Sequence, residues 1–115
     1  MDKRGMFKST QTILPSAART ISGNTNSFKV GTSENIRLYV DVTVEPGVAT
    51  LDIIIQTSPD NTKWYDAKTV TQITGIGQFT DLATQVGPYV RAAYTIGGAG
   101  GFTFEMKLAK FNLVS

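Results

Sequence analysis

The chemistry open to this chain is limited first by two residue types that it lacks. Its 115 residues include no His and no Cys. Without His, a catalytic triad with an imidazole base is excluded, and the most common ligand of transition metals is missing. Without Cys, the chain can form no disulfide, no zinc–thiolate centre and no thiol nucleophile. Enzymatic chemistry is therefore left to carboxylates and lysines, and we expect a binding or structural protein rather than an enzyme.

Carboxylates are the groups that could still act in pairs, as they do in glycoside hydrolases. The candidates are Asp41, Glu45, Asp52, Asp66, Asp81 and Glu105. Their spacing singles out no pair, and most occupy positions that a strand would point into solvent. A calcium loop needs six or more oxygen ligands, whereas Asp60 and Asn61 are typical turn residues with Asp66 some distance on. We therefore expect no catalytic residue, no metal site and no cofactor.

Aromatic side chains are the groups best suited to bind a ligand without catalysis. Tyr39 and Tyr65 could form a platform on which sugar rings stack. Trp64 directly precedes Tyr65, and neighbouring residues of a strand point to opposite faces, so we expect Trp64 in the core and Tyr65 on the surface. A carbohydrate-binding module is accordingly one hypothesis, and it predicts that changing Tyr39 or Tyr65 removes glycan binding.

A glycine-rich segment at residues 97–101 (GGAGG) invites comparison with phosphate-binding loops. It lacks the Lys-Ser/Thr end of such a loop, and the pattern that follows it is that of a strand rather than a helix. We expect this segment to form the tip of a β-hairpin.

The elements that must position these residues are strands. Residues 35–43 (NIRLYVDVT) alternate strictly between apolar and polar side chains, as a half-buried strand does. Similar patterns, separated by turn residues, predict seven to nine short strands about 8–12 residues apart and no helix. We therefore predict an all-β fold, an antiparallel β-sandwich with either jelly-roll or immunoglobulin-like topology. Ile54 breaks its strand's alternation by facing outward, which makes it a candidate subunit contact.

The charge is unevenly distributed along the chain. Residues 1–29 hold five Lys or Arg and one Asp, a net charge of 5 − 1 = +4, whereas residues 30–115 hold six basic and eight acidic side chains, a net charge of −2. We predict a basic amino-terminal arm at residues 1–11 and a single β-sandwich domain at residues 12–115. The cations of the arm are not interleaved with aromatic residues, so we expect no direct nucleic-acid partner. No apolar run approaches the roughly 20 residues of a membrane span, so we expect no membrane partner.

Four segments occur in an order that resembles a group of small virion proteins of tailed bacteriophages. They are residues 12–22 (TILPSAARTIS), 40–47 (VDVTVEPG), 51–65 (LDIIIQTSPDNTKWY) and 89–104 (YVRAAYTIGGAGGFTF). In that group an LxSAART opening leads into a DVTxxPG strand and turn. An LxxxIQxSxDxxxWYD segment and an xYVRxxxTxGG…FTF segment follow. Pro15 and Asn61 depart from the pattern, since a small residue and a Gly are more common there. The resemblance covers about residues 12–108, most of the chain.

This resemblance implies a non-enzymatic β-sandwich located on the phage virion. Our leading hypothesis is a capsid decoration, or cement, protein on the outer capsid surface. It would form homo-oligomers, which we expect to be trimers, and bind the assembled lattice of the major capsid protein. A ring protein of the neck or tail would use the same fold and arm, and a carbohydrate-binding module on the virion is the alternative of a different class. The expected contacts are Lys3, Arg4 and Lys8 of the arm with the capsid or another copy, and Tyr39, Ile54 and Tyr65 between subunits.

Overall fold

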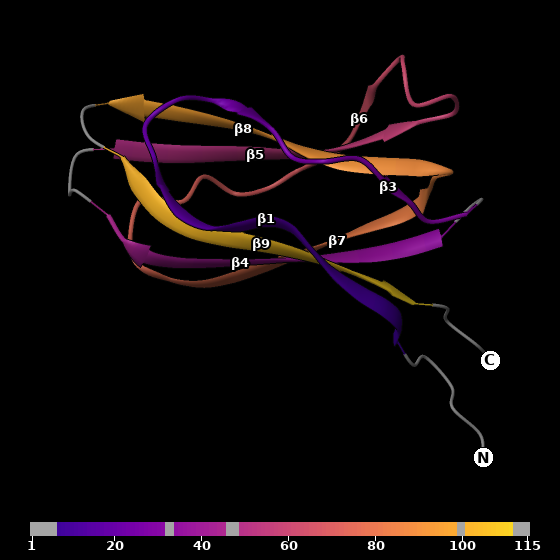
Figure 1. The fold of residues 1–115 in the computed structure, drawn as a ribbon, viewed down its shortest axis with the longest axis horizontal. Helices are drawn as coiled ribbons and strands as arrows, with labels where there is room; N and C mark the ends of the chain where they lie inside the picture. Colours follow the sequence, from indigo (N-terminus) through magenta and orange to yellow (C-terminus); the bar gives the residue numbers. More distant parts are fainter. Residues whose placement is uncertain (1–6, 32–33, 46–48, 99–100, 112–115) are drawn as a thin grey trace.

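The structure is a computed structural model that describes residues 7–31, 34–45, 49–98 and 101–111. These residues form a two-layer β-sandwich of nine strands (Figure 1). Sheet A contains, in spatial order, β1 (Phe7–Arg19), β9 (Phe102–Phe111), β4 (Glu34–Val44) and β7 (Gly77–Val86). Sheet B contains β2 (Gly23–Asn24), β8 (Tyr89–Gly98), β5 (Ala49–Ser58) and β6 (Tyr65–Thr69), with β3 (Phe28–Lys29) also paired to β8. Within the described part of the chain, no helix is long and apolar enough to span a membrane.

The strand pairings decide between the two topologies that the sequence leaves open. All pairs are antiparallel, and four of them are nested around the β5–β6 hairpin: β4 pairs with β7, β2 and β3 pair with β8, and β1 pairs with β9. The chain is thus one long antiparallel ribbon, wound so that β4 also pairs with β9 and β5 with β8. Since β2 and β3 together occupy one strand position, the fold is an eight-position jelly roll.

The glycine-rich segment at residues 97–101 does not form the predicted hairpin tip. β8 belongs to sheet B and β9 to sheet A, so this segment connects the two sheets; residues 99–100 lie outside the described residues. A Cβ at Gly101 would lie 2.4 Å from the carbonyl oxygen of Arg19, so the backbone of β1 passes too close for a side chain. The prediction fails because glycine followed by an alternating strand is the same local signal for a hairpin and for a sheet-to-sheet connection.

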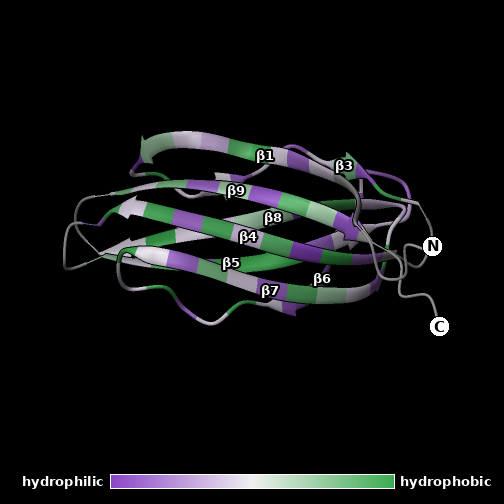
Figure 2. Ribbon diagram, turned by 90° about the horizontal axis from the view of Figure 1, so that it is seen from below, coloured by the Kyte–Doolittle hydropathy of each residue, from purple (hydrophilic) through white to green (hydrophobic). Residues whose placement is uncertain are grey.

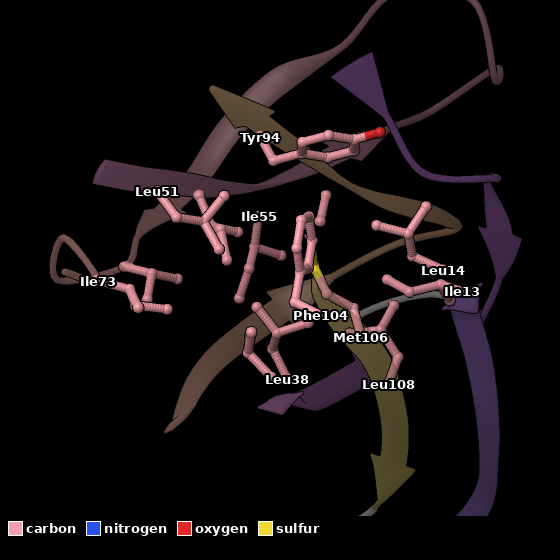
Figure 3. Close-up of a cluster of buried hydrophobic side chains, with 14 of the residues drawn as sticks. Ile13, Leu14, Leu38, Leu51, Ile55, Ile73, Tyr94, Phe104, Met106 and Leu108 are labelled. Atoms are coloured by element: carbon pink, nitrogen blue, oxygen red, sulfur yellow. The ribbon is translucent and has the colours of Figure 1, made fainter. Parts of the chain in front are cut away.

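The core lies between the sheets and is built from alternate strand positions. Figure 2 shows this alternation of hydrophobic and hydrophilic residues along β9, β4 and β7. Leu38, Phe104 and Met106 of sheet A meet Leu51 and Ile55 of sheet B, and all five are fully buried (Figure 3). The outward positions between them are consequently free to carry polar side chains, and these positions form the two outer faces of the sandwich.

Strand β1 begins inside the predicted amino-terminal arm. Phe7 pairs with Phe111, and residues 9–12 pair with residues 110–107 of β9. Residues 7–11 are therefore part of sheet A, and only residues 1–6 of the predicted arm lie outside the described residues. Pro15 falls where the register shifts between Leu14 and Ala17, on the edge strand of the sheet, so its missing N–H costs no central ladder bond.

Candidate functional site

Two groups of outward-facing side chains are the candidates for binding, one on each sheet. The Trp64 cluster, on sheet B, consists of Gln56, Trp64, Asp66 and Arg91. The Tyr39 groove, on sheet A, is lined by five outward-facing residues, Tyr39, Asp41, Gln78, Glu105 and Lys107, and by Val40 and Phe79, whose side chains pack with the core. The two groups lie on opposite faces of the sandwich, because each faces away from the core that the two sheets share.

Arg91 is the centre of the Trp64 cluster. Its guanidinium carbon lies 4.3 Å from the centroid of the Trp64 ring, within the range of a cation–π interaction. Its Nε donates a hydrogen bond of 2.8 Å to Oε1 of Gln56, whose Nε2 donates one of 3.0 Å to Oδ1 of Asp66. Val90 and Ala92, on either side of Arg91, are buried, which places Arg91 on the outer face. The cluster thus connects β8, β5 and β6 across the exterior of sheet B.

Trp64 does not lie in the core, which corrects the prediction made for it. It is half-buried against Arg91, while Tyr65 is 50% exposed and all five residues of β6 are exposed. The alternation rule presumes a strand with one covered face. β6 is a short edge strand with both faces exposed to solvent. Alternation along it therefore does not place either aromatic side chain in the core.

The loop between β5 and β6 is held by Ser58 and Asp60, as its turn residues predict. Oγ of Ser58 accepts hydrogen bonds from the backbone N–H groups of Asp60 and Asn61, at 3.2 and 2.8 Å. Oδ1 of Asp60 accepts from the N–H groups of Thr62 and Lys63, each at 3.0 Å. The Lys63 N–H, followed by the hydrogen bonds from Thr62, lowers the pKa of Asp60 far below its ordinary value. Among the described residues, no group of three or more acidic side chains could hold a metal ion.

The Tyr39 groove has a volume of about 340 Å³ and crosses three strands of sheet A. In one row across the sheet, Tyr39 of β4 pairs with Lys107 of β9 and with Thr80 of β7. In the next outward row, Asp41 pairs with Glu105 and with Gln78. Two residues along a strand separate the rows, a distance of about 7 Å. The groove therefore places an aromatic ring beside a row of three hydrogen-bonding side chains.

Two carboxylates face each other in this groove. Asp41 and Glu105 are direct cross-strand partners on the outer face, and Nζ of Lys107 lies 4.0 Å from Oε1 of Glu105. Both carboxylates are partly exposed, whereas the general acid of a glycoside hydrolase sits in apolar surroundings. The arrangement suits hydrogen bonding to a ligand better than proton transfer.

The three predicted subunit contacts do not come together in the structure. Tyr39 lies on the outer face of sheet A, whereas Ile54 and Tyr65 lie on sheet B. Ile54 faces outward as predicted but is half-buried between its strand partners Thr69 and Ala93.

The predicted contacts of the arm are only in part within the described residues. Lys3 and Arg4 lie outside them, and Lys8 is part of β1.

Sequence reasoning did not single out Arg91, the centre of the Trp64 cluster, and it did not predict that Glu105 and Lys107 lie beside Tyr39. Alternation places each of these side chains on an outer face, but strand parity alone does not say which strands are neighbours. The pairing of β4 with β9, and of β5 with β8, joins segments more than 30 residues apart in the sequence. The missing information is therefore the long-range strand pairing.

Comparisons with known proteins define the fold class. No model of a protein family matches the sequence, and no curated protein matches it. Among solved structures, the chain is similar to the CBM22-1 xylan-binding domain of Xyn10C from Paenibacillus barcinonensis, with a TM-score of 0.50, 13% sequence identity and 100% of both chains covered. At this identity the likeness concerns the fold alone. The class defined by fold and surface is an antiparallel β-sandwich that carries polar, partly aromatic surfaces on its outer faces.

Proposed function

We propose that this chain is a non-enzymatic structural protein of a tailed-phage virion and that it binds the assembled capsid shell as a decoration protein. The proposal begins from the four ordered segments that resemble small virion proteins. Jelly rolls occur in viral capsid proteins and in lectins, so the topology agrees with the proposal by analogy only. The observation that carries the proposal is that side chains from the segments of the resemblance lie together on the outer face of sheet B.

Residues from two of the four segments meet in the Trp64 cluster, with Asp66 following directly. Gln56 and Trp64 belong to residues 51–65, and Arg91 belongs to residues 89–104. Any β-sandwich core has apolar residues at alternating positions. A sandwich core does not require the cluster on the outer face, in which a Gln, a Trp, an Asp and an Arg contact one another. Arg and Trp are also the residue types enriched at the energetic centres of protein interfaces. We therefore assign the shell contact to this face of sheet B.

The basic amino-terminal segment is the second contact in the proposal. Residues 1–29 carry a net charge of +4, to which residues 1–6 contribute 2 − 1 = +1, and a basic segment suits an acidic groove on the shell or on another copy of the chain. Because β1 begins at Phe7, a deletion that tests the arm without removing strand residues must end at residue 6. Binding only the assembled lattice would stabilise the shell by mass action.

The test mixes the purified full-length chain with empty capsid shells of its phage and measures co-sedimentation and copy number. We expect saturable binding at lattice positions, which cryo-electron microscopy would locate. Deleting residues 1–6 and, separately, changing Arg91→Ala should each weaken binding at least about tenfold. Thr84→Ala is the matched control, because Thr84 is exposed on β7 in the opposite sheet and lies outside both surfaces.

One outcome would contradict the assigned contacts, and another would contradict the decoration role itself. Undiminished binding by both variants would show that neither the arm nor the Trp64 cluster contacts the shell. A closed ring of fixed copy number that ignores shells and caps portals or tail tubes would assign the protein to the neck or tail. Light scattering of the free protein tests the expected trimer in the same preparation.

A further inference from the structure

We infer that the Tyr39 groove is a binding site for a neutral saccharide, a function separate from the proposed contact of sheet B with a capsid shell. The groove lies on sheet A, so both ligands could be bound at once. Its volume of about 340 Å³ is at the small end of the range of roughly 300–1,000 Å³ for ligand pockets. A site of this size suits one or two sugar units.

The aromatic side of the groove provides the apolar contact that a sugar ring needs. Tyr39 is half-buried in the middle of β4, where the flanking strands β9 and β7 hold it on both sides. Phe79, the other aromatic residue of the lining, is half-buried and packs against the core, so Tyr39 provides the aromatic ring on the outer face of the groove. A pyranose presents C–H groups on its face, and an aromatic ring contributes buried apolar area to such a face at little cost in conformational entropy.

The polar side of the groove provides hydrogen-bond partners for hydroxyl groups at the right distance. Asp41 and Glu105 offer carboxylate acceptors, and Gln78 offers both a donor and an acceptor. These three side chains form the row about 7 Å along the strands from Tyr39. A sugar ring stacked at Tyr39 would therefore direct the hydroxyls on one edge toward this row.

The pairing of Asp41 with Glu105 is unfavourable for the folded chain without a ligand. Like charges directly opposite each other on neighbouring strands destabilise a sheet, and Lys107 approaches only one of the two, at 4.0 Å from Glu105. A sequence that breaks a local stability rule on an otherwise regular strand is expected to do so at a functional site. Two hydroxyl donors from one ligand would relieve the repulsion by hydrogen bonding to both carboxylates.

The charges of the groove favour a neutral ligand over an ion. The two carboxylates and Lys107 sum to −1, which opposes an anionic saccharide. A cation would need several more oxygen ligands than two carboxylates supply. The Lys107 ammonium already lies beside Glu105, where a bound cation would be repelled.

The test is titration of the full-length chain with cellohexaose, xylohexaose and maltohexaose as neutral probes and a chondroitin sulfate hexasaccharide as the anionic probe. Isothermal calorimetry and saturation-transfer NMR measure binding. We expect at least one neutral probe to bind with a Kd of about 1 mM or below. Tyr39→Ala should weaken this binding at least about tenfold, while Thr84→Ala should leave it unchanged.

Asp41→Asn and Glu105→Gln distinguish a binding role from a structural one. Each substitution keeps the shape of the side chain and removes one of the two negative charges that face each other. We expect weaker saccharide binding together with an unchanged or higher thermal midpoint, because the repulsion is relieved. A residue that served only the fold would lower the midpoint, so these two variants remain decisive even where Tyr39→Ala folds poorly.

Four results would overturn the inference. The first is the absence of saturable binding by every neutral probe at 10 mM or more, about ten times the expected Kd. The second is tighter binding of the sulfated probe, and the third is binding that disappears on addition of EDTA. The fourth is loss of binding in Tyr65→Ala but not in Tyr39→Ala. The last result would move the saccharide to the exposed Tyr65 on sheet B. Each of them leaves the shell-binding proposal to its own experiment, because that experiment uses different variants and a different ligand.

Discussion

At the residue scale, Asp60 fixes a loop through hydrogen bonds although its side chain is exposed. Its carboxylate accepts the N–H groups of Thr62 and Lys63, and the hydroxyl of Ser58 donates to it at 3.1 Å. Asn61 adopts a φ of 64°, a left-handed conformation that Asn tolerates better than most residues. The string Ser-Pro-Asp-Asn-Thr therefore predicts this loop from local chemistry alone, and the structure agrees.

The stability supplied by Asp60 should depend on pH in a defined direction. Its pKa is lower in the folded than in the unfolded chain, mainly because of the Lys63 N–H. The ionised form is therefore favoured by folding, and the stabilisation is complete above the unfolded pKa of about 3.9 and declines as the pH falls below it. We expect Asp60→Asn to have a lower thermal midpoint than the wild type at pH 7, with the difference shrinking below about pH 4. A difference that stayed constant down to pH 2 would contradict this assignment.

The local pattern around a single residue does not always predict whether its side chain is buried. Trp64 and Tyr65 are neighbours in the sequence, so alternation predicts that one of them points into the core, yet neither lies in the core. What decides their burial is the position of β6 at the edge of sheet B, which depends on strands far away in the sequence. The candidate binding surfaces could not be predicted for the same reason, since Tyr39 acquires Lys107 and Glu105 as neighbours only through the pairing of β4 with β9.

At the element scale, the strands were predictable from alternation, and the connections between them were not. The sequence predicts a strand over residues 35–43, and β4 spans Glu34–Val44 with the expected residues buried. The segments between strands carry the same Gly and Pro signals whether they turn back in one sheet or pass to the other. The Gly87–Pro88 segment has the sequence of a turn, yet it joins β7 of sheet A to β8 of sheet B.

Gly87 should be intolerant of substitution because the backbone of Gly31 lies directly against it. Its φ is +118°, and a Cβ there would lie 1.8 Å from the carbonyl oxygen of Gly31. Its N–H also donates a 2.9 Å hydrogen bond to Oγ1 of Thr57 at the end of β5. We expect Gly87→Ala to lower the free energy of unfolding by about 3 kcal/mol or to prevent folding, since strain of this kind costs roughly 1–3 kcal/mol before the clash is added.

Gly75→Ala is the matched control, because a Cβ at Gly75 would have no atom within 4 Å. This change should alter the free energy of unfolding by no more than about 0.5 kcal/mol. Urea denaturation measures both variants, with the midpoint compared at constant slope. A loss in Gly87→Ala as small as that expected for Gly75→Ala would mean that the connection can move away from Gly31 and would contradict the prediction.

At the scale of the whole molecule, the nested ribbon brings the first and last strands of the described residues together. β1 and β9 are the first and last strands, and their pairing runs from Phe7 with Phe111 to Arg19 with Phe102 (Figure 1). Local patterns are compatible with either of two sandwich topologies, because the choice lies in pairings between the most distant parts of the chain. For the same reason, removing residues at one terminus can remove the partner of the other.

Two deletions separate the arm from the sheet. Deleting residues 1–6 removes no described strand residue, so the thermal midpoint should change by less than about 2 °C, equivalent to a few tenths of a kcal/mol for a domain of this size. Deleting residues 1–11 also removes the partners of residues 108–111 of β9, where Leu108 and Ala109 are buried. With a net contribution of about 1 kcal/mol for each lost ladder hydrogen bond, we expect a loss of at least about 2 kcal/mol.

Differential scanning calorimetry of the two deletion variants checks this prediction and also decides how shell binding is interpreted. If the longer deletion is as stable as the full chain, residues 7–11 do not pair in solution and belong functionally to the arm. If it is less stable, weakened shell binding by that variant reports damage to sheet A as well as loss of charge. The shorter deletion removes Lys3 and Arg4 while retaining Lys8 and all of β1. Loss of shell binding at an unchanged midpoint in that variant would therefore assign the contact to residues 1–6, which carry these two cations.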